Sequence, residues 1–459
     1  MLQPVFLVLY SLFYIHYSSA LQQPTANKGK LHKVLSLAFG LSVSFAGIIG
    51  LGIFRTPGEV AEKIGNPTVF ILLWIAGAVY AMIGVFSVAE LGAMIPRSGG
   101  PYCFARRSMG PLPAFIIGWG DFLSWSAGDA AFLIILSEYL LLLFPSMGIW
   151  AKIIPLLFTC LFALLQWQGV LWGARLQKIA ALVKAVFMLA LIIIFFTVNP
   201  RHPELVNHTL SSPPVTFSAI MIALQSIIYT YDGWHYPTYF SEEISNPAKL
   251  PKAMIRGVLI VSVTYLILFF AMMHIMPVAS MAGEKLVIGK VAQIVLGDVA
   301  GKLVNLIVII FIISSMNLDY MIGSRILYAI SSDKLGVNKA ATVNKGGTPN
   351  IALFITWASI VFFTVTGSFD FLISVLSIIF VFTYSMLFLS VILLREKEPE
   401  LHRPYKAWGY PYTTIFSFIA SIAFLGAVVK GDPKNSLYAL LLMMFCVPVY
   451  FLLKAINKS

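Results

Sequence analysis

Long runs of uncharged apolar residues recur along the whole chain, and they constrain its fold more than any other feature. The run from Leu189 to Val198 reads LALIIIFFTV, and runs of roughly 18 or more such residues are what membrane-spanning helices require. Only 11% of the 459 residues are charged, whereas soluble domains carry about a quarter. Strands of a membrane barrel would show alternating hydrophobicity over about 10 residues. The sequence therefore predicts an all-α, polytopic membrane protein.

Hydropathy and charge together predict twelve spans and their orientation. Alternate connections and both tails carry 21 Lys and Arg residues, the other connections carry 9, and Lys184 lies within a span. Because basic loops stay in the cytoplasm, both ends of the twelve-helix core are expected on the cytoplasmic side. The expected membrane is the plasma membrane. The predicted spans are 34–54, 67–95, 114–144, 153–170, 179–198, 217–240, 254–277, 302–330, 350–367, 370–394, 412–430 and 436–455.

Several functional classes have no support in the sequence. The formal net charge is +12, but the basic residues are spread over loops, so no nucleic-acid partner is expected. Cys103, Cys160 and Cys446 are far apart and show no CxxC spacing, so we expect apolar filler and no disulfide-linked accessory subunit. The sequence has no P-loop, metal-ligand cluster or nucleophile triad. We expect no cofactor, no metal and no enzymatic activity.

The first 33 residues have an uncertain status. Val5 to Ala20 has the length of a signal peptide, but no basic residue precedes it. A cleaved signal would also set the basic cluster around Lys28 outside. We favour a mis-assigned start that lies upstream of the true one, although no internal Met precedes Met82. The residues that remain before position 34 would then form a cytoplasmic tail. Mass spectrometry of the mature N-terminus tests the mis-assigned start.

Two spans contain residues that weaken a helix near its middle. Ala46 to Phe54 reads AGIIGLGIF, and Tyr229 to Pro237 reads YTYDGWHYP. Glycine and proline also serve close packing in membrane helices, so each cluster alone is weak evidence. The two clusters lie in the first and sixth spans, about 180 residues apart, as in transporters built from two inverted repeats of five helices. The predicted parts are 1–33, the repeats 34–198 and 215–394, and the last two helices with the tail at 395–459.

An unwound helix exposes backbone groups that bind ions. Free amides at the N-terminus of a half-helix attract an anion, and free carbonyls at a C-terminus attract a cation. An amino acid could place its carboxylate on the amides of Gly50 to Gly52. Its ammonium would then face carbonyls near Ile48, Tyr229 and Asp232. Non-helical backbone at this depth is tolerated only around a cavity, so these residues predict a binding site for a zwitterion.

Five motifs in order resemble the amino acid, polyamine and organocation transporter superfamily, nearest its L-type amino acid transporter and bacterial permease branches. The resemblance covers residues 34–455. It implies five plus five inverted repeats with broken helices one and six, two extra helices, and alternating-access transport of amino acids. The motifs are GIIGLGIFRTPG (47–58), AELGAMIPRSGGPY (89–102), YDGW (231–234), EEISNPAKLPKAM (242–254) and RPYKAWGYP (403–411).

The resemblance assigns roles to individual residues of the two breaks. Gly50, Leu51 and Gly52 match the family segment that binds the substrate carboxylate, with Leu51 where the family has serine or threonine. A hydroxyl donor is therefore lost and apolar bulk is gained. Ile48, Tyr229 and Asp232 match positions whose carbonyls receive the ammonium group in relatives, and Tyr229 also matches an aromatic gate. Gly233 is expected in the same substrate site.

Lys184 lies where the superfamily often has a lysine in place of a sodium ion. It is expected to link the broken first helix to the eighth, near Gly47 and Ser315, and to serve in proton coupling. An intramembrane ammonium marks function by default, but a lysine two turns from the interface can also snorkel. Asn317 matches a position near the substrate side chain, or it bridges helices.

Other polar residues keep two interpretations each. Asp121 and Asp129 share one face of the third span and either bind a cation or protons, or pair structurally. Asp232 alternatively caps the next half-helix, and His235 carries a proton or packs. Glu242 and Glu243 form an inner-gate salt bridge with Arg97 or Arg325, or end a helix in solvent. KLVIGKVAQIVLG (285–297) is an outer lid or a plain interfacial helix. The sequon at Asn207 matters only in a glycosylating host.

The sequence thus predicts a secondary transporter of neutral L-amino acids that works as a proton symporter or an exchanger. A cationic amino acid or polyamine is the alternative, because of Asp129, Asp232 and the weakened carboxylate site at Leu51. A sensor that binds amino acids without moving them would keep the same site, but the short tails argue against it. A membrane enzyme would have only Asp121 and Asp129 as a candidate catalytic pair.

Overall fold

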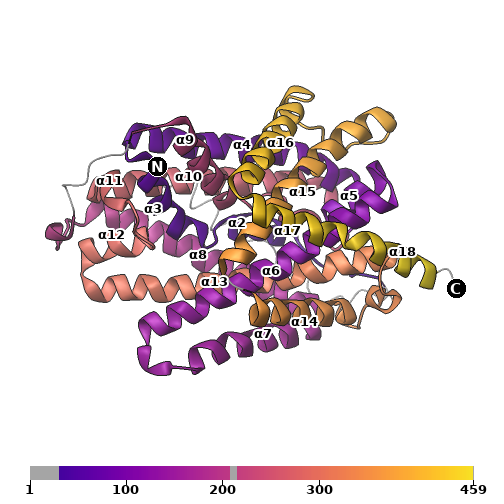
Figure 1. Ribbon diagram of the computed structural model, residues 1–459, viewed down its shortest axis with the longest axis horizontal. Coiled ribbons are helices and arrows are strands. Elements are labelled where there is room, and N and C mark those ends of the chain that lie inside the picture. Colours follow the sequence, from indigo (N-terminus) through magenta and orange to yellow (C-terminus); the bar gives the residue numbers. More distant parts are fainter. Residues whose placement is uncertain (1–29, 207–213, 368, 458–459) are drawn as a thin grey trace.

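The chain forms a bundle of helices whose long axes mostly run along one direction (Figure 1). The computed structural model describes residues 30–206, 214–367 and 369–457, so the segment Val5 to Ala20 and the sequon at Asn207 lie outside the described residues. Nine helices in the described residues are long and apolar enough to cross a membrane. Helical elements account for nearly all regular structure there, with one isolated parallel bridge between Leu35 and Ile244.

The α-helices follow one another with short connections. Their bounds are α2 Leu37–Ile48, α3 Gly52–Ile64, α4 Pro67–Met94, α5 Pro101–Ser108, α6 Pro111–Leu143, α7 Trp150–Gln168, α8 Val170–Thr197, α9 Phe217–Thr230, α10 Leu250–Ile275, α11 Val278–Met281, α12 Val287–Leu296, α13 Asp298–Ser332, α14 Asn350–Thr366, α15 Phe369–Lys397, α16 Tyr412–Gly431, α17 Pro433–Met444 and α18 Cys446–Ile456. The short 3₁₀ helices include η3 Tyr236–Phe240.

Several helices begin at a local side-chain cap. The carboxamide of Asn66 accepts a hydrogen bond from the amide of Val69 at 3.1 Å, directly before Pro67 opens α4. The hydroxyls of Ser36 and Thr216 do the same for α2 and α9. These contacts satisfy amides that have no partner within the helix, and proline at the first position loses no hydrogen bond.

The broken first span lies at the centre of the bundle. In the apolar window of Leu37–Ile64, 61% of the residues are buried, against 22% in α16 and in Pro433–Ile456. The α2 half packs against α10 and α8, and the α3 half against α9. Helices α16, α17 and α18 lie along one side of the bundle (Figure 1). The segments with unwound backbone are therefore enclosed by regular helices.

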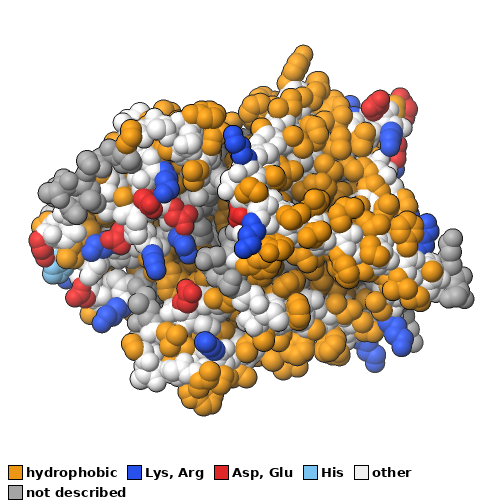
Figure 2. Space-filling model, viewed as in Figure 1, with side chains coloured by type: hydrophobic (Ala, Val, Ile, Leu, Met, Phe, Trp, Pro, Cys, Tyr) orange, Lys and Arg blue, Asp and Glu red, His pale blue; other side chains and the backbone are white. Residues whose placement is uncertain are grey.

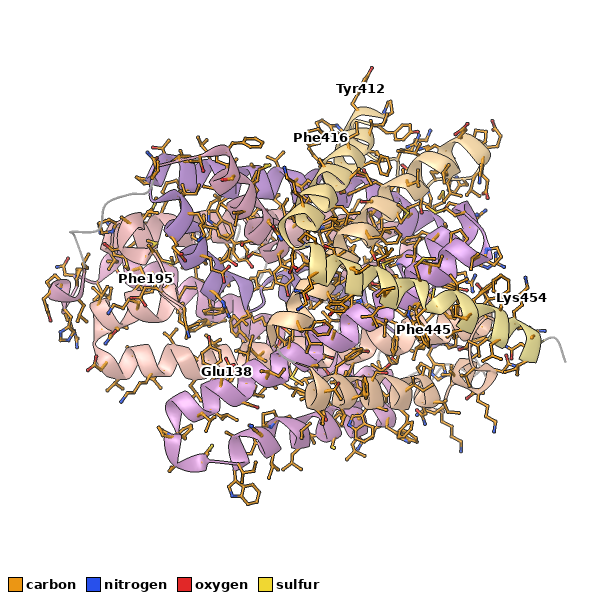
Figure 3. All side chains as sticks on the ribbon, viewed as in Figure 1. Glu138, Phe195, Tyr412, Phe416, Phe445 and Lys454 are labelled. Atoms are coloured by element: carbon orange, nitrogen blue, oxygen red, sulfur yellow. The ribbon has the colours of Figure 1, made fainter. Side chains whose placement is uncertain are left out.

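Apolar side chains cover the outside of the bundle between two charged ends. Figure 2 shows hydrophobic atoms over the middle, with charged side chains gathered at the left and right ends. Tyr412 and Phe416 of α16 are 82% and 57% exposed and point away from the bundle, whereas Phe195 of α8 is fully buried (Figure 3). Such a surface is stable against lipid, since every backbone group of a regular helix is paired within it.

Two spans differ from the predicted ones. The first continues past 54 to Ile64, because the charged face of α3 with Arg55 and Glu59 borders a cavity and not lipid. The last is split into α17 and α18, which meet at Phe445. The amphipathic stretch 285–297 forms α12, whose apolar face packs mainly on α13.

Candidate functional site

The first break leaves backbone amides unpaired at the start of α3. Helix α2 ends at Ile48, and the amide of Gly50 turns back to the carbonyl of Ile48 at 2.9 Å. Within the described residues, no acceptor faces the amides of Leu51 and Gly52. The predicted anion site at Gly50 to Gly52 thus has its available donors at Leu51 and Gly52, where the positive end of the α3 dipole also lies.

The second break is organised around the carboxylate of Asp232. Helix α9 ends at Thr230, and η3 begins at Tyr236. The carboxylate accepts hydrogen bonds from the amide of Gly233 at 2.6 Å, from the hydroxyl of Tyr236 at 2.8 Å and from the hydroxyl of Tyr384 on α15. It therefore caps the turn that follows the break and still lines the cavity described below.

The two breaks touch at Gly233. Its φ of +114° lies where L-residues are rare, and a Cβ there would sit 2.7 Å from the carbonyl carbon of Gly47 and 2.8 Å from the amide of Ile48. Only glycine allows this backbone approach.

We expect Gly233→Ala to lower the free energy of unfolding by about 1–3 kcal/mol, from backbone strain and overlap. Thermal unfolding in detergent measures this effect. Gly426→Ala on α16 is the matched control, since a Cβ there meets nothing within 4 Å. Equal melting temperatures for the two variants would contradict the expectation.

Both breaks open into one cavity of about 450 Å³. Gly52 lies against α9, where a Cβ would come within 2.9 Å of the hydroxyl of Thr230. That hydroxyl donates to Thr56 of α3 at 2.7 Å, so the two half-helices are joined on this wall. The lining residues are Gly47, Ile48, Gly50, Leu51, Gly52, Arg55, Thr56, Glu59, Phe132, Ile135, Ile222, Gln225, Ser226, Tyr229, Thr230, Asp232, Tyr236 and Ser377.

A wider, charged cavity of about 890 Å³ adjoins the first one and shares Leu51, Arg55 and Ile135 with it. Its walls come from α3, α6, residues 283–293 with most of α12, and the start of α13, and they form part of the charged left end in Figure 2. The backbone amide of Gly283 donates to the carbonyl of Gly58 on α3. The α11–α12 segment is therefore attached to α3 and borders the wider cavity.

The opposite end is closed by a buried ion pair. Arg325 of α13 donates two hydrogen bonds of 2.9 Å to Glu243, and both side chains are fully buried. Glu242 accepts from the amide of Ser98, and burial raises the pKa of its carboxyl. Nearby, Arg97 contacts Asp333 at 2.9 Å. Glu243 thus pairs with Arg325 and does not end a helix in solvent.

Lys184 of α8 is 1% exposed and joins three helices. Its ammonium donates to the carbonyls of Ala46 at 3.0 Å and Ile49 at 2.7 Å, and to the hydroxyl of Ser315 on α13 at 3.3 Å. The side chain therefore does not snorkel to the interface. It supplies donors to carbonyls that the end of α2 leaves unpaired.

Some predicted ligands are engaged elsewhere. The carbonyl of Ile48 already accepts from Gly50 and from the hydroxyl of Tyr265, and that of Tyr229 accepts from the amide of Asp232. Asn317 does not reach the cavity. It is fully buried, accepts from Gln166 at 2.7 Å and donates to the carbonyl of Gly173, so it bridges α7, α8 and α13.

One buried acid was not expected from the sequence. Asp319 on α13 lies close enough to Asp129 on α6 for the two carboxyl groups to interact electrostatically, and it also interacts with the charge of Lys184. Neither carboxylate lines the cavity. The available signal was a carboxylate within an apolar span, two residues from Asn317. Gln225, Ser226 and Thr230 are further wall residues that carry no sequence motif.

The sequence profile of the family described as "Amino acid permease" matches residues 33–448. The chain belongs to this amino acid permease family. The match takes in both breaks, Lys184 and the cavity, and with the apolar helices it makes the permease a multi-pass membrane protein.

Known relatives match this permease over almost its whole length. The "Serine/threonine exchanger SteT" of Bacillus subtilis (strain 168) is 27% identical over 94% of this chain and 98% of the relative. The "b(0,+)-type amino acid transporter 1" of Mus musculus is 25% identical over 92% and 88%. The "Large neutral amino acids transporter small subunit 2" of Mus musculus is 27% identical over 92% and 81%.

Proposed function

We propose that this permease transports neutral L-amino acids by alternating access, as an exchanger or a proton symporter. One observation carries the proposal. The unpaired amides of Leu51 and Gly52 and the carboxylate of Asp232 line the same cavity. A zwitterion has one group for each, because the start of a helix attracts its carboxylate and an acid attracts its ammonium.

The ammonium site proposed here differs in one respect from the one expected. The carbonyl of Ile48 has two donors already, so the carboxylate of Asp232 takes the main part in binding the ammonium. Leu51 contributes its amide to the carboxylate site, and Gly52 and Gly233 allow the close approach of the two broken segments. Tyr229, 37% exposed, lies at the edge of the cavity and acts as the gate.

The rest of the cavity wall supports a neutral side chain. Phe132, Ile135 and Ile222 provide an apolar surface, and Gln225 and Ser226 provide polar groups. The charged residues Arg55 and Glu59 of the wall pair with each other at 2.8 Å. Their opposite charges compensate each other, so this pair favours neither a cationic nor an anionic side chain of the substrate. A wall of this kind suits small polar and apolar amino acids.

We propose the full twelve-span architecture for the bundle. The nine long apolar helices, together with α6 and the two shorter apolar helices α9 and α14, make twelve spans. The breaks then fall in spans one and six, which supports inverted repeats over 34–198 and 215–394, with 395–459 as an addition. The basic clusters support a cytoplasmic position for the Arg325–Glu243 end in a plasma-membrane protein, with the cavity described above open to the outside.

We propose that the permease works without a disulfide-linked accessory subunit. Cys103 and Cys446 are buried, and Cys160 is exposed within α7, so none of the three cysteines lies in an outer loop.

The closed pair Arg325–Glu243 would act as the inner gate, with Glu242 beside it. Substrate that bridges the half-helices favours the occluded state by its differential affinity, and the inner end can then open.

A cationic amino acid or polyamine is the second candidate. The observation that favours it is the carboxylate of Asp232 in the cavity wall, which could pair with a cationic side chain. Uptake of labelled leucine into liposomes that contain the purified permease separates the candidates. We expect alanine and serine to compete with leucine. Competition by lysine or putrescine and not by alanine would refute the neutral assignment.

Asp232→Asn tests the site itself. The amide keeps the size of the side chain but removes the charge that holds an ammonium group. We expect KM for leucine to rise by at least about tenfold, the value of one charge-assisted hydrogen bond of 1.5–3 kcal/mol. Glu204→Gln, an exposed acid at the start of η2 Pro203–Leu205, is the matched control. An unchanged KM in Asp232→Asn would remove this carboxylate from the substrate site.

A further inference from the structure

A series of closely spaced, buried titratable groups leads from the cavity into α6. The Nδ1 of His235 lies 3.7 Å from Oδ1 of Asp232. The Nε2 of the same ring lies 3.4 Å from the hydroxyl of Tyr239, and that hydroxyl donates to both carboxylate oxygens of Asp121 at 2.9 Å. His235, Tyr239 and Asp121 are all fully buried, so water does not compete along the series.

The two ends of the series lie at different depths. Asp232 lines the cavity and is 9% exposed. Asp121 is ten residues into α6, about 15 Å along the helix from Pro111, and its partner Tyr239 accepts a backbone hydrogen bond from Gly99, two residues from Arg97 of the closed end. The series therefore passes from the open cavity toward the closed end of the bundle.

The orientation of His235 is not explained by packing alone. Its Nδ1 is buried and has no hydrogen-bond partner in the described residues, and it faces the carboxylate of Asp232. Buried polar atoms are usually paired, and an unpaired one in a native structure calls for a functional reason. At 3.7 Å the two atoms are just beyond hydrogen-bonding distance, and a small movement of the ring lets a protonated Asp232 donate to Nδ1.

We propose that Asp232, His235, Tyr239 and Asp121 form a proton-binding relay that couples transport to proton entry. A proton reaches Asp232 from the cavity and moves to Nδ1 of His235. The Nε2 proton of the ring moves to the hydroxyl of Tyr239, which gives its own proton to Asp121. One proton thus passes from Asp232 to Asp121, with no net change of charge on the ring or the phenol. Return of the ring to its starting tautomer resets the series.

Other groups around the relay do not take its proton. Arg325 is paired with Glu243, and Glu90 of α4 with Arg395 and Arg403. Lys184 contacts none of the four relay groups through a hydrogen bond in the described residues. The remaining titratable groups near η3 are Tyr80 of α4, Tyr236 of η3, Asp319 of α13 and Tyr384 of α15, and α2 contributes none.

This inference rests on the proposed function and adds the coupling ion and its path. The test uses liposomes that hold a trapped pH-sensitive dye and the purified permease. Leucine added outside, with an inward proton gradient, should acidify the interior in the wild type. Counterflow of labelled leucine against internal leucine measures transport that needs no net proton movement.

The decisive variant is Tyr239→Phe, which removes one hydroxyl in the middle of the relay. We expect leucine-driven acidification to fall by at least roughly tenfold, while counterflow stays within about twofold. Asp121→Asn should do the same at the end of the relay. Tyr80→Phe is the matched control, because this buried tyrosine shares its hydroxyl with Ser421 on α16 and not with the relay.

Each outcome decides between the two claims. Acidification that persists in both Tyr239→Phe and Asp121→Asn overturns the relay. Wild-type counterflow without any acidification also overturns it and leaves amino acid transport intact. Variants that lose counterflow together with acidification, yet elute as folded monodisperse protein, show a structural role and overturn the relay. A wild type with neither activity removes the proposed function and this inference with it.

Discussion

Replacing Arg325 with methionine is expected to lower the free energy of unfolding by about 3–5 kcal/mol, because the carboxylate of Glu243 would stay buried without its partner. Both side chains are fully buried, and the guanidinium donates two hydrogen bonds of 2.9 Å to the carboxylate. Thermal unfolding in detergent, followed by intrinsic fluorescence, measures the loss.

The double variant Arg325→Met with Glu243→Met separates the charge from the packing. It removes both ions, so we expect it to recover most of the lost stability. Arg107→Met is the control for an exposed pair. Arg107 contacts Glu398 at 2.7 Å with both side chains about one third exposed, and such pairs contribute about 0–1 kcal/mol. A double variant no more stable than Arg325→Met alone would contradict the account.

The same pair should also control the closed end of the cavity. In Arg325→Met we expect a cysteine placed at the lining position Ser377 to react with a membrane-impermeant thiol reagent from the cytoplasmic side of the vesicles, in a background without the native cysteines. Reaction that stays confined to the outer side would show that Arg325–Glu243 stabilises the fold without acting as a gate.

Lys184→Ala is expected to lower the initial rate of net leucine uptake by at least about tenfold. The ammonium holds the carbonyls of Ala46 and Ile49, which adjoin the first break, and reaches Ser315 on another helix. Each charge-assisted hydrogen bond contributes about 1.5–3 kcal/mol, so its loss allows the end of α2 to move. Initial rates of uptake at several pH values measure the effect.

The control for this variant is Lys152→Ala, which removes an exposed lysine from the neighbouring helix α7. Lys184→Arg adds a second comparison, because it keeps the charge but cannot match the compact geometry of the ammonium group. Wild-type uptake by Lys184→Ala at every pH would refute both the structural link and the coupling role expected from the sequence.

Much of the fold could be predicted from local sequence properties. Apolar runs give helices wherever the backbone must pair its own groups in lipid, and proline, asparagine and glycine mark ends such as Asn66 and Gly65. The interruptions near Gly50 and Asp232 were also predictable, because glycine and a buried acid weaken a helix locally. The interruption between α17 and α18 at Phe445 was not predicted, although Pro448 in the first turn of α18 is a local signal for it, because proline cannot continue the hydrogen-bonding of the preceding turn.

The candidate site was only partly predictable, because its contacts join residues far apart in the chain. The use of the Ile48 carbonyl by Tyr265, the bridge made by Asn317 and the approach of Asp319 to Asp129 all depend on how helices pack. Glu243 had two candidate partners in the sequence, and only the packing of α13 assigned it to Arg325.

The sequence by itself determined the class of protein, the family and the positions of the two breaks, since these follow from composition, motifs and local backbone preference. Tertiary structure alone decided which exposed backbone groups stay free. Within the described part of the chain, the amides of Leu51 and Gly52 have no acceptor, whereas the carbonyls of Ala46 and Ile49 accept hydrogen bonds from Lys184. The ring of His235 lies between Asp232 and Tyr239. The reason is physical: a buried polar group is satisfied by whichever partner packing brings within about 3 Å, and sequence distance does not limit that choice.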